Sequence, residues 1–390
     1  MSKTRKELRL GILGLGNMGR VHAASVLAGK IPRCRLTAVF DTRPDALTPY
    51  AEKGIACFSD VKKLCQSGEA DALLIATPHY SHTELGVEAL KAGLHVLVEK
   101  PISVHKADCE RLIGAHQSKK QVFAAMFNQR TDPYYLKLRH LIRSGELGKI
   151  RRINWIITNW FRPNAYYASG GWRATWEGEG GGVLLNQCPH QLDLWQWLFG
   201  MPARVRAHCQ VGRYHKIEVE DDVTAYMEYA DGTTGVFITS TGEAPGTNRL
   251  EVAGERGRVV IENDQFLFTR NETEMSEFSR TTSESFASPP KWNVEIPISG
   301  HGGQHNEIME NFTKAILDKA PLIAPAAEGI HSVELANAMI LSSFTNQTIE
   351  LPMSAPAYER FLKKQIAGST FKKVVKKQTP AADFSKSFAK

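Results

Sequence analysis

The chain has two regions with different patterns of hydrophobic and polar residues, and the first region covers residues 1–127. Apolar residues there gather in short, nearly continuous runs, and segments with helical spacing separate these runs. Strands have this pattern when helices cover a sheet on both faces, which is typical of a parallel sheet. The predicted strands are Leu8–Leu13, Leu36–Phe40, Asp71–Thr77, Leu94–Val98 and Gln121–Phe127, and the predicted helices are Val21–Leu27, His82–Ala92 and Ala107–Ser118.

The second pattern, over residues 128–360, predicts strands joined by short turns, which is typical of an antiparallel sheet. We expect a polar excursion at Asn263–Gly303 and helices at Gln304–Ala320 and Gly329–Ser343. The fold class is therefore α/β, with a parallel N-terminal domain and a C-terminal domain on an open, mainly antiparallel sheet. The predicted strands are Ile150–Trp160, Ala203–Val211, Asp222–Tyr229, Thr234–Thr241, Arg249–Ala253 and Arg258–Glu262.

Composition and charge are those of a soluble protein. Its 390 residues, 42% of them hydrophobic and 23% charged, favour two domains. The net charge of +7 lies at the ends, because residues 363–390 carry +7 and residues 1–9 carry +3, which leaves −3 between them. This distribution argues against nucleic acid as a partner. We interpret residues 361–390 as a basic, flexible tail.

Cysteine usage and hydropathy predict a cytoplasmic protein. The six cysteines are scattered without a Cys-x-x-Cys pair, which favours reduced thiols and no metal site. No apolar stretch approaches the roughly 18 residues of a membrane span, so we expect no membrane partner.

A glycine motif, Gly14-Leu15-Gly16-Asn17-Met18-Gly19, follows the first predicted strand and opens a helix. Glycines at this spacing permit a tight turn and close approach of a pyrophosphate to a helix N-terminus. Asp41 ends the next strand, where its carboxylate would accept hydrogen bonds from ribose hydroxyls and repel a 2′-phosphate. NAD is therefore preferred, although Arg43 could still serve NADP.

Four motifs in order make the chain resemble the Gfo/Idh/MocA oxidoreductases, over about residues 8–355. The motifs are Gly14–Gly19, Thr77–His82, Glu99–Pro101 and Gly180–Asp193. The resemblance implies an N-terminal Rossmann domain and an open C-terminal sheet that forms a homodimer or homotetramer. It also implies NAD(P)-dependent hydride transfer on sugars, inositols or related polyols.

By this resemblance Lys100 and His190 are the catalytic pair. A lysine beside the nicotinamide can stabilise a developing alkoxide, and a histidine suits the general base. Asn186 and His190 are four residues apart and would share a helix face, although Pro189 could start or kink a helix there. Many relatives carry aspartate at the position of Asn186, so this chain departs from their pattern. Asp193 could orient the His190 ring or bind substrate.

The remaining assignments also follow from the resemblance. The expected cofactor-binding residues are Gly14, Gly16, Asn17, Met18, Gly19, Asp41, Arg43, Thr77, Pro78, His82, Glu99, Lys100, Trp172 and Arg173. The expected substrate-binding residues are Asn128, Tyr167, Arg173, Asn186 and Asp193.

The leading hypothesis is an NAD-dependent dehydrogenase that converts a secondary hydroxyl of a sugar, glycoside or cyclic polyol to a ketone. Two alternatives remain open. One is a glycoside-cleaving enzyme that uses bound NAD for transient oxidation and elimination. The other is a non-catalytic NAD(P)-sensing regulator, against which the presence of both Lys100 and His190 counts.

Overall fold

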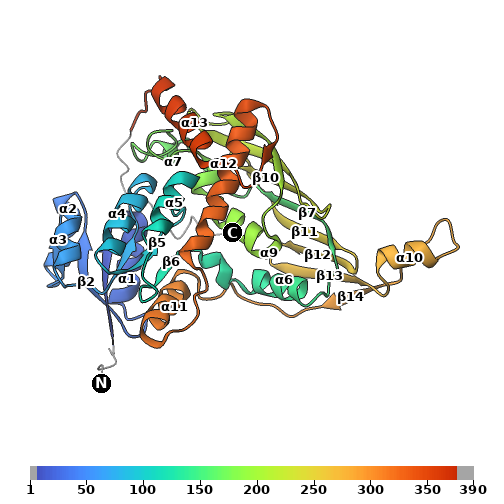
Figure 1. The fold of residues 1–390 in the computed structure, drawn as a ribbon, viewed down its shortest axis with the longest axis horizontal. Coiled ribbons are helices and arrows are strands. Elements are labelled where there is room, and N and C mark those ends of the chain that lie inside the picture. Colours follow the sequence, from blue (N-terminus) through green and yellow to red (C-terminus); the bar gives the residue numbers. More distant parts are fainter. Residues whose placement is uncertain (1–6, 376–390) are drawn as a thin grey trace.

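The computed structural model describes residues 7–375 and folds them around two sheets (Figure 1). The first sheet is parallel and has six strands in the order β3-β2-β1-β4-β5-β6. Its elements are β1 Leu8–Leu13, α1 Asn17–Leu27, β2 Cys34–Phe40, α2 Pro44–Ala51, β3 Ala56–Phe58, α3 Val61–Gln66, β4 Ala72–Ile75, α4 His79–Lys91, β5 His95–Val98, α5 Lys106–Gly114 and β6 Phe123–Ala125.

The second sheet has nine strands in the order β14-β13-β12-β11-β7-β10-β9-β8-β15. Its pairs are antiparallel except β7 with β10, which is parallel. The elements after β6 are η1 Asn128–Thr131, α6 Pro133–Arg143, β7 Ile150–Ile157, α7 Asn164–Tyr167, α8 Val183–Asn186, α9 Pro189–Phe199, β8 Arg204–Val211, β9 Glu220–Glu228, β10 Thr234–Ser240, β11 Asn248–Gly254, β12 Gly257–Glu262, β13 Gln265–Asn271, α10 Met275–Thr281, β14 Lys291–Glu295, α11 Gln304–Asp318, η2 Ala326–Glu328, α12 Gly329–Thr345, β15 Ile349–Glu350 and α13 Ala355–Gly368.

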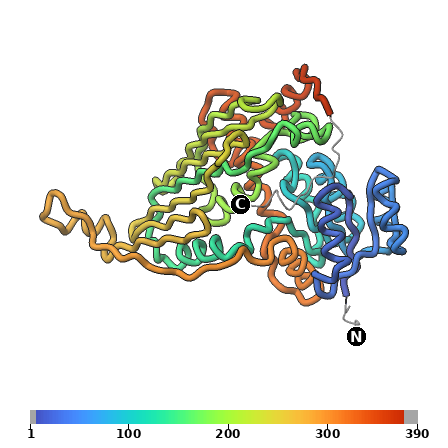
Figure 2. Tube along the Cα trace, turned by 180° about the vertical axis from the view of Figure 1, so that it is seen from behind, coloured from blue at the N-terminus to red at the C-terminus, as the bar shows by residue number. Residues whose placement is uncertain are grey.

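The fold class is confirmed: a Rossmann half with a parallel sheet and a second half with a mixed, mainly antiparallel sheet. One expectation is wrong, because Asn263–Gly303 is not simply an excursion from the sheet. It contains β13 and β14, and alternate residues of β13, Phe266 and Phe268, are buried under the sheet. The segment around α10 between these strands projects from the far edge of the sheet (Figures 1 and 2).

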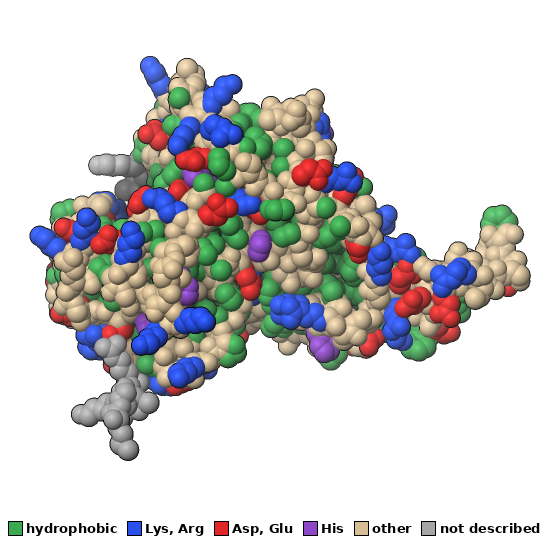
Figure 3. Space-filling model, in the orientation of Figure 1, with side chains coloured by type: hydrophobic (Ala, Val, Ile, Leu, Met, Phe, Trp, Pro, Cys, Tyr) green, Lys and Arg blue, Asp and Glu red, His purple; other side chains and the backbone are tan. Residues whose placement is uncertain are grey.

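The C-terminal part of the chain also differs from the expected tail. Helix α13 continues to Gly368, so residues 361–368 are helical. Residues 376–390, which hold much of the predicted basic tail, lie outside the described residues. On the face in Figure 3, Lys and Arg side chains are interspersed with Asp and Glu.

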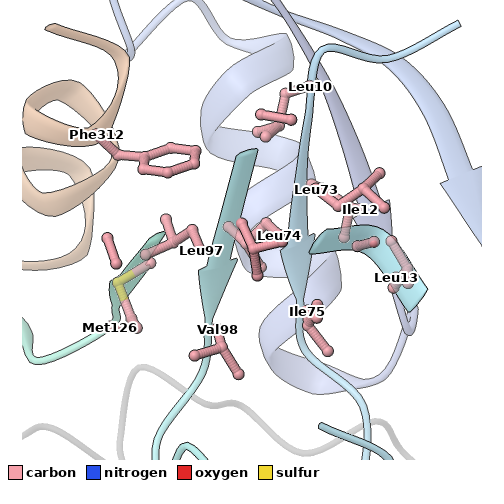
Figure 4. Close-up of a cluster of buried hydrophobic side chains, with 14 of the residues drawn as sticks. Leu10, Ile12, Leu13, Leu73, Leu74, Ile75, Leu97, Val98, Met126 and Phe312 are labelled. Carbon is pink, nitrogen blue, oxygen red and sulfur yellow. The ribbon is translucent and has the colours of Figure 1, made fainter. Parts of the chain in front are cut away.

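A helix from the second half of the sequence completes the core of the first. Phe312 of α11 is 2% exposed and packs among the strand residues of the Rossmann sheet, such as Leu10 and Leu97 (Figure 4). The chain therefore returns to its first sheet after building the second.

A buried ion pair joins the two halves. Lys106 of α5 places its Nζ 2.6 Å from Glu334 Oε1 of α12 and 2.8 Å from the Met353 carbonyl oxygen. Both side chains are almost wholly buried, so separating the halves would leave two charges without partners. This pair and the packing of α12 against α5, α9 and β8 hold the two halves in register.

We expect Phe312→Ala to lower the free energy of unfolding by about 3–5 kcal/mol, because it opens a cavity under α11. Urea denaturation followed by far-UV circular dichroism measures this change. Phe286→Ala is the matched control, since Phe286 is 102% exposed and should leave stability nearly unchanged. Equal stability of the two variants would mean that α11 is not part of the first core.

Candidate active site

The glycine turn between β1 and α1 leaves room for a ligand at only one of its glycines. Gly14 has a φ of +87°, and a Cβ there would lie 2.8 Å from the Ala76 carbonyl oxygen. A Cβ at Gly19 would lie 1.8 Å from the Gly14 carbonyl oxygen, so the helix start packs directly on the turn. A Cβ at Gly16 would meet nothing within 4 Å. The turn thus presents open backbone at Gly16 before the N-terminus of α1, as an approaching pyrophosphate requires.

Asp41 and Arg43 lie together at the end of β2. Asp41 accepts hydrogen bonds from the backbone N–H of Leu15, at 2.8 Å, and of Arg43, at 2.9 Å. Burial acts to raise the pKa of Asp41, but the bonds to Arg43 and Leu15 outweigh it and the pKa is lowered. The carboxylate is therefore ionised beside the glycine turn, where the sequence predicted it. Asn17 and Met18 begin α1 next to it.

The turn after β5 carries Glu99 and Lys100, and the Lys100–Pro101 peptide bond is cis. Glu99 is buried with its Oε1 2.6 Å from His22 Nε2 of α1. Burial acts to raise the pKa of Glu99, but the bond to His22 and the positive field of His22 lower it to about 2. Glu99 is thus an anion, and its contact with His22 joins α1 to the turn after β5.

His82 of α4 contacts the same turn at Pro101. Its two ring nitrogens each lie 2.8 Å from a carbonyl oxygen, that of Pro101 and that of Thr77. The ring is fully buried, and burial lowers its pKa. The ring therefore packs between Thr77 and Pro101 and positions the turn, and its expected contact with the cofactor stays a prediction. Thr77 and Pro78 remain at the carboxyl end of β4, before α4.

Lys100 crosses from the first half to the second. Its Nζ donates a hydrogen bond of 2.9 Å to the backbone carbonyl of Asn186 at the end of α8. Burial lowers the pKa of Lys100, while the negative charges of Glu99 and Glu179 oppose this effect. The amine therefore sits in an environment that makes its proton easier to lose than that of an ordinary lysine.

His190 faces the same space. Burial, and after it the positive charge of Lys100, holds the pKa of His190 well below its usual value, so the imidazole is neutral. Its Nδ1 is buried and has no hydrogen-bond partner among the described residues. The structure thus brings together a lysine from β5 and a neutral histidine from α9. A neutral imidazole with a free nitrogen can accept a proton.

Asn186 and His190 do not share one helix. Helix α8 ends at Asn186, and α9 begins at Pro189. Proline suits the first position of a helix because its missing N–H would have no partner there. Of the two roles left open for Pro189, it therefore starts a helix, and this break places His190 in the first turn of α9.

An aromatic and cationic wall lies beside Asn186. Arg173 donates from Nη1 to the Tyr166 hydroxyl at 2.7 Å, and that hydroxyl donates to Asn186 Oδ1 at 3.1 Å. The Arg173 guanidinium also lies over the rings of Tyr166 and Trp172, at 4.6 and 4.7 Å. Trp172 contacts His79 of α4 edge-on, at 5.4 Å between ring centroids. Trp172 and Arg173 therefore lie at the junction of the two halves, and their expected contact with the cofactor stays a prediction.

Two expected substrate residues point elsewhere. The Tyr167 hydroxyl lies 2.7 Å from Thr241 Oγ1 inside the second core, so its neighbour Tyr166 faces the site instead. Asp193 is fully buried and pairs with Arg130 through both oxygens, at 2.6 and 2.7 Å. With its oxygens engaged, Asp193 neither orients His190 nor reaches substrate.

Asn128 lies at the start of η1, just after β6. Its Nδ2 donates to Gln304 Oε1 at 2.6 Å, while its buried Oδ1 has no partner among the described residues. The expected role in substrate binding stays a prediction.

Two residues of the site, His305 and Glu179, were not predicted from the sequence. His305 of α11 has its ring centroid 5.6 Å from that of His22, and burial lowers its pKa to about 4. Glu179 is buried against Asn186. The signal available for Glu179 was its position directly before the glycine run Gly180–Gly182. No local signal marks His305, which lies in a distant helix.

The described residues contain no cluster of three or more histidine, cysteine or acidic side chains able to hold a metal ion. Within the same residues, no helix is both long enough and apolar enough to span a bilayer.

Comparison with known families matches both halves. Residues 8–127 match the oxidoreductase family with an NAD-binding Rossmann fold, and residues 135–260 match the GFO/IDH/MocA C-terminal domain. The first half is therefore an NAD-binding domain, and the cofactor predicted from the glycine motif is confirmed.

Curated relatives and solved structures cover most of the chain. It is 26% identical over 266 residues to myo-inositol 2-dehydrogenase of Thermotoga maritima, covering 66% of this chain and 75% of that protein. It is 23% identical over 390 residues to levoglucosan dehydrogenase of Pseudarthrobacter phenanthrenivorans, covering 89% and 99%. The WlbA dehydrogenase of Chromobacterium violaceum, in complex with NADH and UDP-GlcNAcA, superposes with a TM-score of 0.77 at 26% identity, covering 90% and 98%.

We expect Asp193→Ala to reduce the free energy of unfolding by about 3 kcal/mol, because it removes the two-oxygen partner of the buried Arg130 charge and leaves only Glu328 paired with it. Urea denaturation checks the value. A variant of normal stability whose only defect is a raised KM for substrate would instead support a ligand-binding role.

Gly16→Ala should weaken NADH binding about tenfold or more, because the methyl group enters space that a pyrophosphate needs. The thermal midpoint should stay the same, since no atom lies within 4 Å of the added carbon. Fluorescence titration with NADH measures the affinity. Gly114→Ala, at another open glycine, is the matched control and should bind normally.

Proposed function

The chain belongs to the GFO/IDH/MocA oxidoreductase family, and on this premise we propose that it oxidises a secondary hydroxyl of a sugar, glycoside or cyclic polyol to a ketone, reversibly, with NAD. The observation that carries the proposal is the meeting of Lys100 and His190 at the junction of the two halves. One comes from the turn after β5 and the other from the first turn of α9.

The residues at the glycine turn fit the cofactor. Gly16 leaves open space at the start of α1, and the ionised Asp41 beside it suits ribose hydroxyls. Arg43 is bound to Asp41, which leaves it less able to serve a 2′-phosphate, so NAD is favoured over NADP. When bound there, the nicotinamide supplies the hydride acceptor.

The chain's own residues handle the proton. The neutral His190 imidazole accepts the proton of the substrate hydroxyl as the C–H bond breaks. The Lys100 ammonium donates a hydrogen bond to the same oxygen and stabilises the negative charge that develops on it. In the reverse direction His190 returns the proton to the ketone oxygen.

The wall beside Asn186 favours a carbohydrate. Aromatic faces pack against the C–H faces of a sugar ring, and the Arg173 guanidinium offers donors to its hydroxyls. Relatives named for myo-inositol and levoglucosan, and a neighbour crystallised with UDP-GlcNAcA, support a ring-shaped polyhydroxy substrate.

We further propose that the protein is a homo-oligomer that associates through the open face of the nine-stranded sheet. The helices α9 and α12 pack on its other face. Large side chains remain exposed on the open face, with Tyr226 at 42% and Leu267 at 54%. A second copy would cover them.

Lys100→Ala and His190→Ala should each lower kcat by about 100-fold or more, because each removes a positioned acid–base group. NADH binding should be retained in both. Steady-state NADH production from a panel of sugars, inositols and glycosides measures the effect. Unimpaired turnover in both variants would refute the assigned roles. Product release without net NADH would favour the glycoside-cleaving alternative.

A further inference from the structure

Glu179 is a buried carboxylate at the junction of the two halves, and its surroundings hold it rigidly. It precedes Gly180 in the glycine-rich segment before α8 and is 2% exposed. Its Oε2 accepts a hydrogen bond of 2.6 Å from the backbone N–H of Ala174, and its Oε1 accepts one from Asn186 Nδ2. Both oxygens therefore have donors, as an ionised carboxylate requires.

Glu179 is connected to Lys100 through a single residue. Asn186 donates from its side chain to Glu179 and accepts the Lys100 ammonium at its own backbone carbonyl, at 2.9 Å. The carboxylate thus anchors the residue that receives the lysine. Movement of Asn186 would move the acceptor of Lys100 with it.

The charges around Lys100 give Glu179 a second role. Glu99 and Glu179 are the carboxylates that act on the amine, and Cys188 and Arg173 also face it. Glu99 is already paired with His22 at 2.6 Å. Glu179 has no such ion-pair partner among the described residues, although the positive charges of Arg173 and Lys373 act on it. The imidazoles near Lys100, which its positive charge disfavours as cations, are His79, His82, His190 and His305.

Burial raises the pKa of Glu179 above the ordinary carboxyl value, and the positive charge of Arg173, the Ala174 N–H and the Asn186 amide act against this rise without cancelling it. Lys373, whose Nζ donates to the Arg173 carbonyl oxygen, adds a further positive charge from the segment after α13. Tyr166, Tyr167 and Glu220 also lie within electrostatic reach.

We propose that Glu179 is the positioning residue for Lys100: it fixes Asn186, whose backbone carbonyl receives the Lys100 ammonium, and its negative charge stabilises that ammonium. This proposal rests on the proposed function in one respect, which is that the Lys100 ammonium stabilises the substrate oxygen. The contact and the charge are properties of the protein alone.

The test is Glu179→Gln, which keeps the size of the side chain and removes its charge. The ionisation of Lys100 should move to lower pH by about 0.5–1 unit, because an opposite charge that stabilised the ammonium is gone. In the pH profile of kcat/KM, the limb that depends on Lys100 should shift in the same direction, and kcat should fall about tenfold or more.

Two further variants separate charge from structure. Glu179→Asp keeps the charge but shortens the reach to Asn186, so kcat should fall while the Lys100 ionisation stays near that of the wild type. Glu218→Gln is the matched control, since Glu218 accepts a hydrogen bond from the Trp176 N–H in the same segment but does not bond to Asn186. It should leave the ionisation unchanged. If Glu179→Gln does not fold, the Asp variant still tests the positioning role.

The Lys100 ionisation can be measured without a substrate. Competitive labelling of the full chain with acetic anhydride, with the Lys100 peptide quantified by mass spectrometry across a pH series, reports it directly. An unshifted Lys100 titration in Glu179→Gln would overturn the proposal. Absence of turnover with every carbohydrate, together with the shifted titration, would refute the proposed function and leave this inference standing.

Discussion

The hydrogen bond from Lys100 Nζ to the Asn186 carbonyl is the constraint on which the site depends, because it joins residues from the two halves. A bond of 2.9 Å between an amine in the turn after β5 and a carbonyl at the end of α8 tolerates little relative movement. The buried pair of Lys106 and Glu334 supplies that rigidity at a second point of the same junction. The fold thus holds the reacting groups in place by a hydrogen bond and an ion pair between its two halves.

The electrostatics of the junction follow from burial. Burial pushes His190, His305 and Lys100 toward their neutral forms, because a low-dielectric interior disfavours isolated charge. Two carboxylates, Glu99 and Glu179, act against this effect on Lys100. In the proposed reaction the two groups act differently, because the neutral His190 imidazole accepts a proton and the Lys100 ammonium stabilises the oxygen that loses it.

The second half of the chain does more than cover the first. Its α11 completes the Rossmann core through Phe312 and brings His305 beside His22. Its nine-stranded sheet supports α8 and α9, whose starts and ends place Asn186 and His190. The site therefore depends on the return of the chain to its first half, since residues as distant in sequence as His22 and His305 meet at one junction.

The features that the sequence determined by itself are local. Gly14, Gly16 and Gly19 are required by the backbone of one turn, Asp41 ends the strand next to it, and Lys100 sits before Pro101. Such motifs depend on residues a few positions apart, so their pattern alone predicts the NAD-binding domain. The alternating strands and helices likewise predicted the two sheets, because periodicity is a property of short segments.

Only the tertiary structure decided which neighbour faces the site. Tyr166 and Tyr167 are indistinguishable by pattern, and the contact with Thr241, just after β10, turns the Tyr167 side chain into the core. Asp193 forms a buried ion pair with Arg130, which lies sixty-three positions away in the sequence. Glu179 gains its place only because Asn186 folds against it. The direction and ionisation of a side chain are set by contacts made after the chain folds, which short-range patterns do not contain.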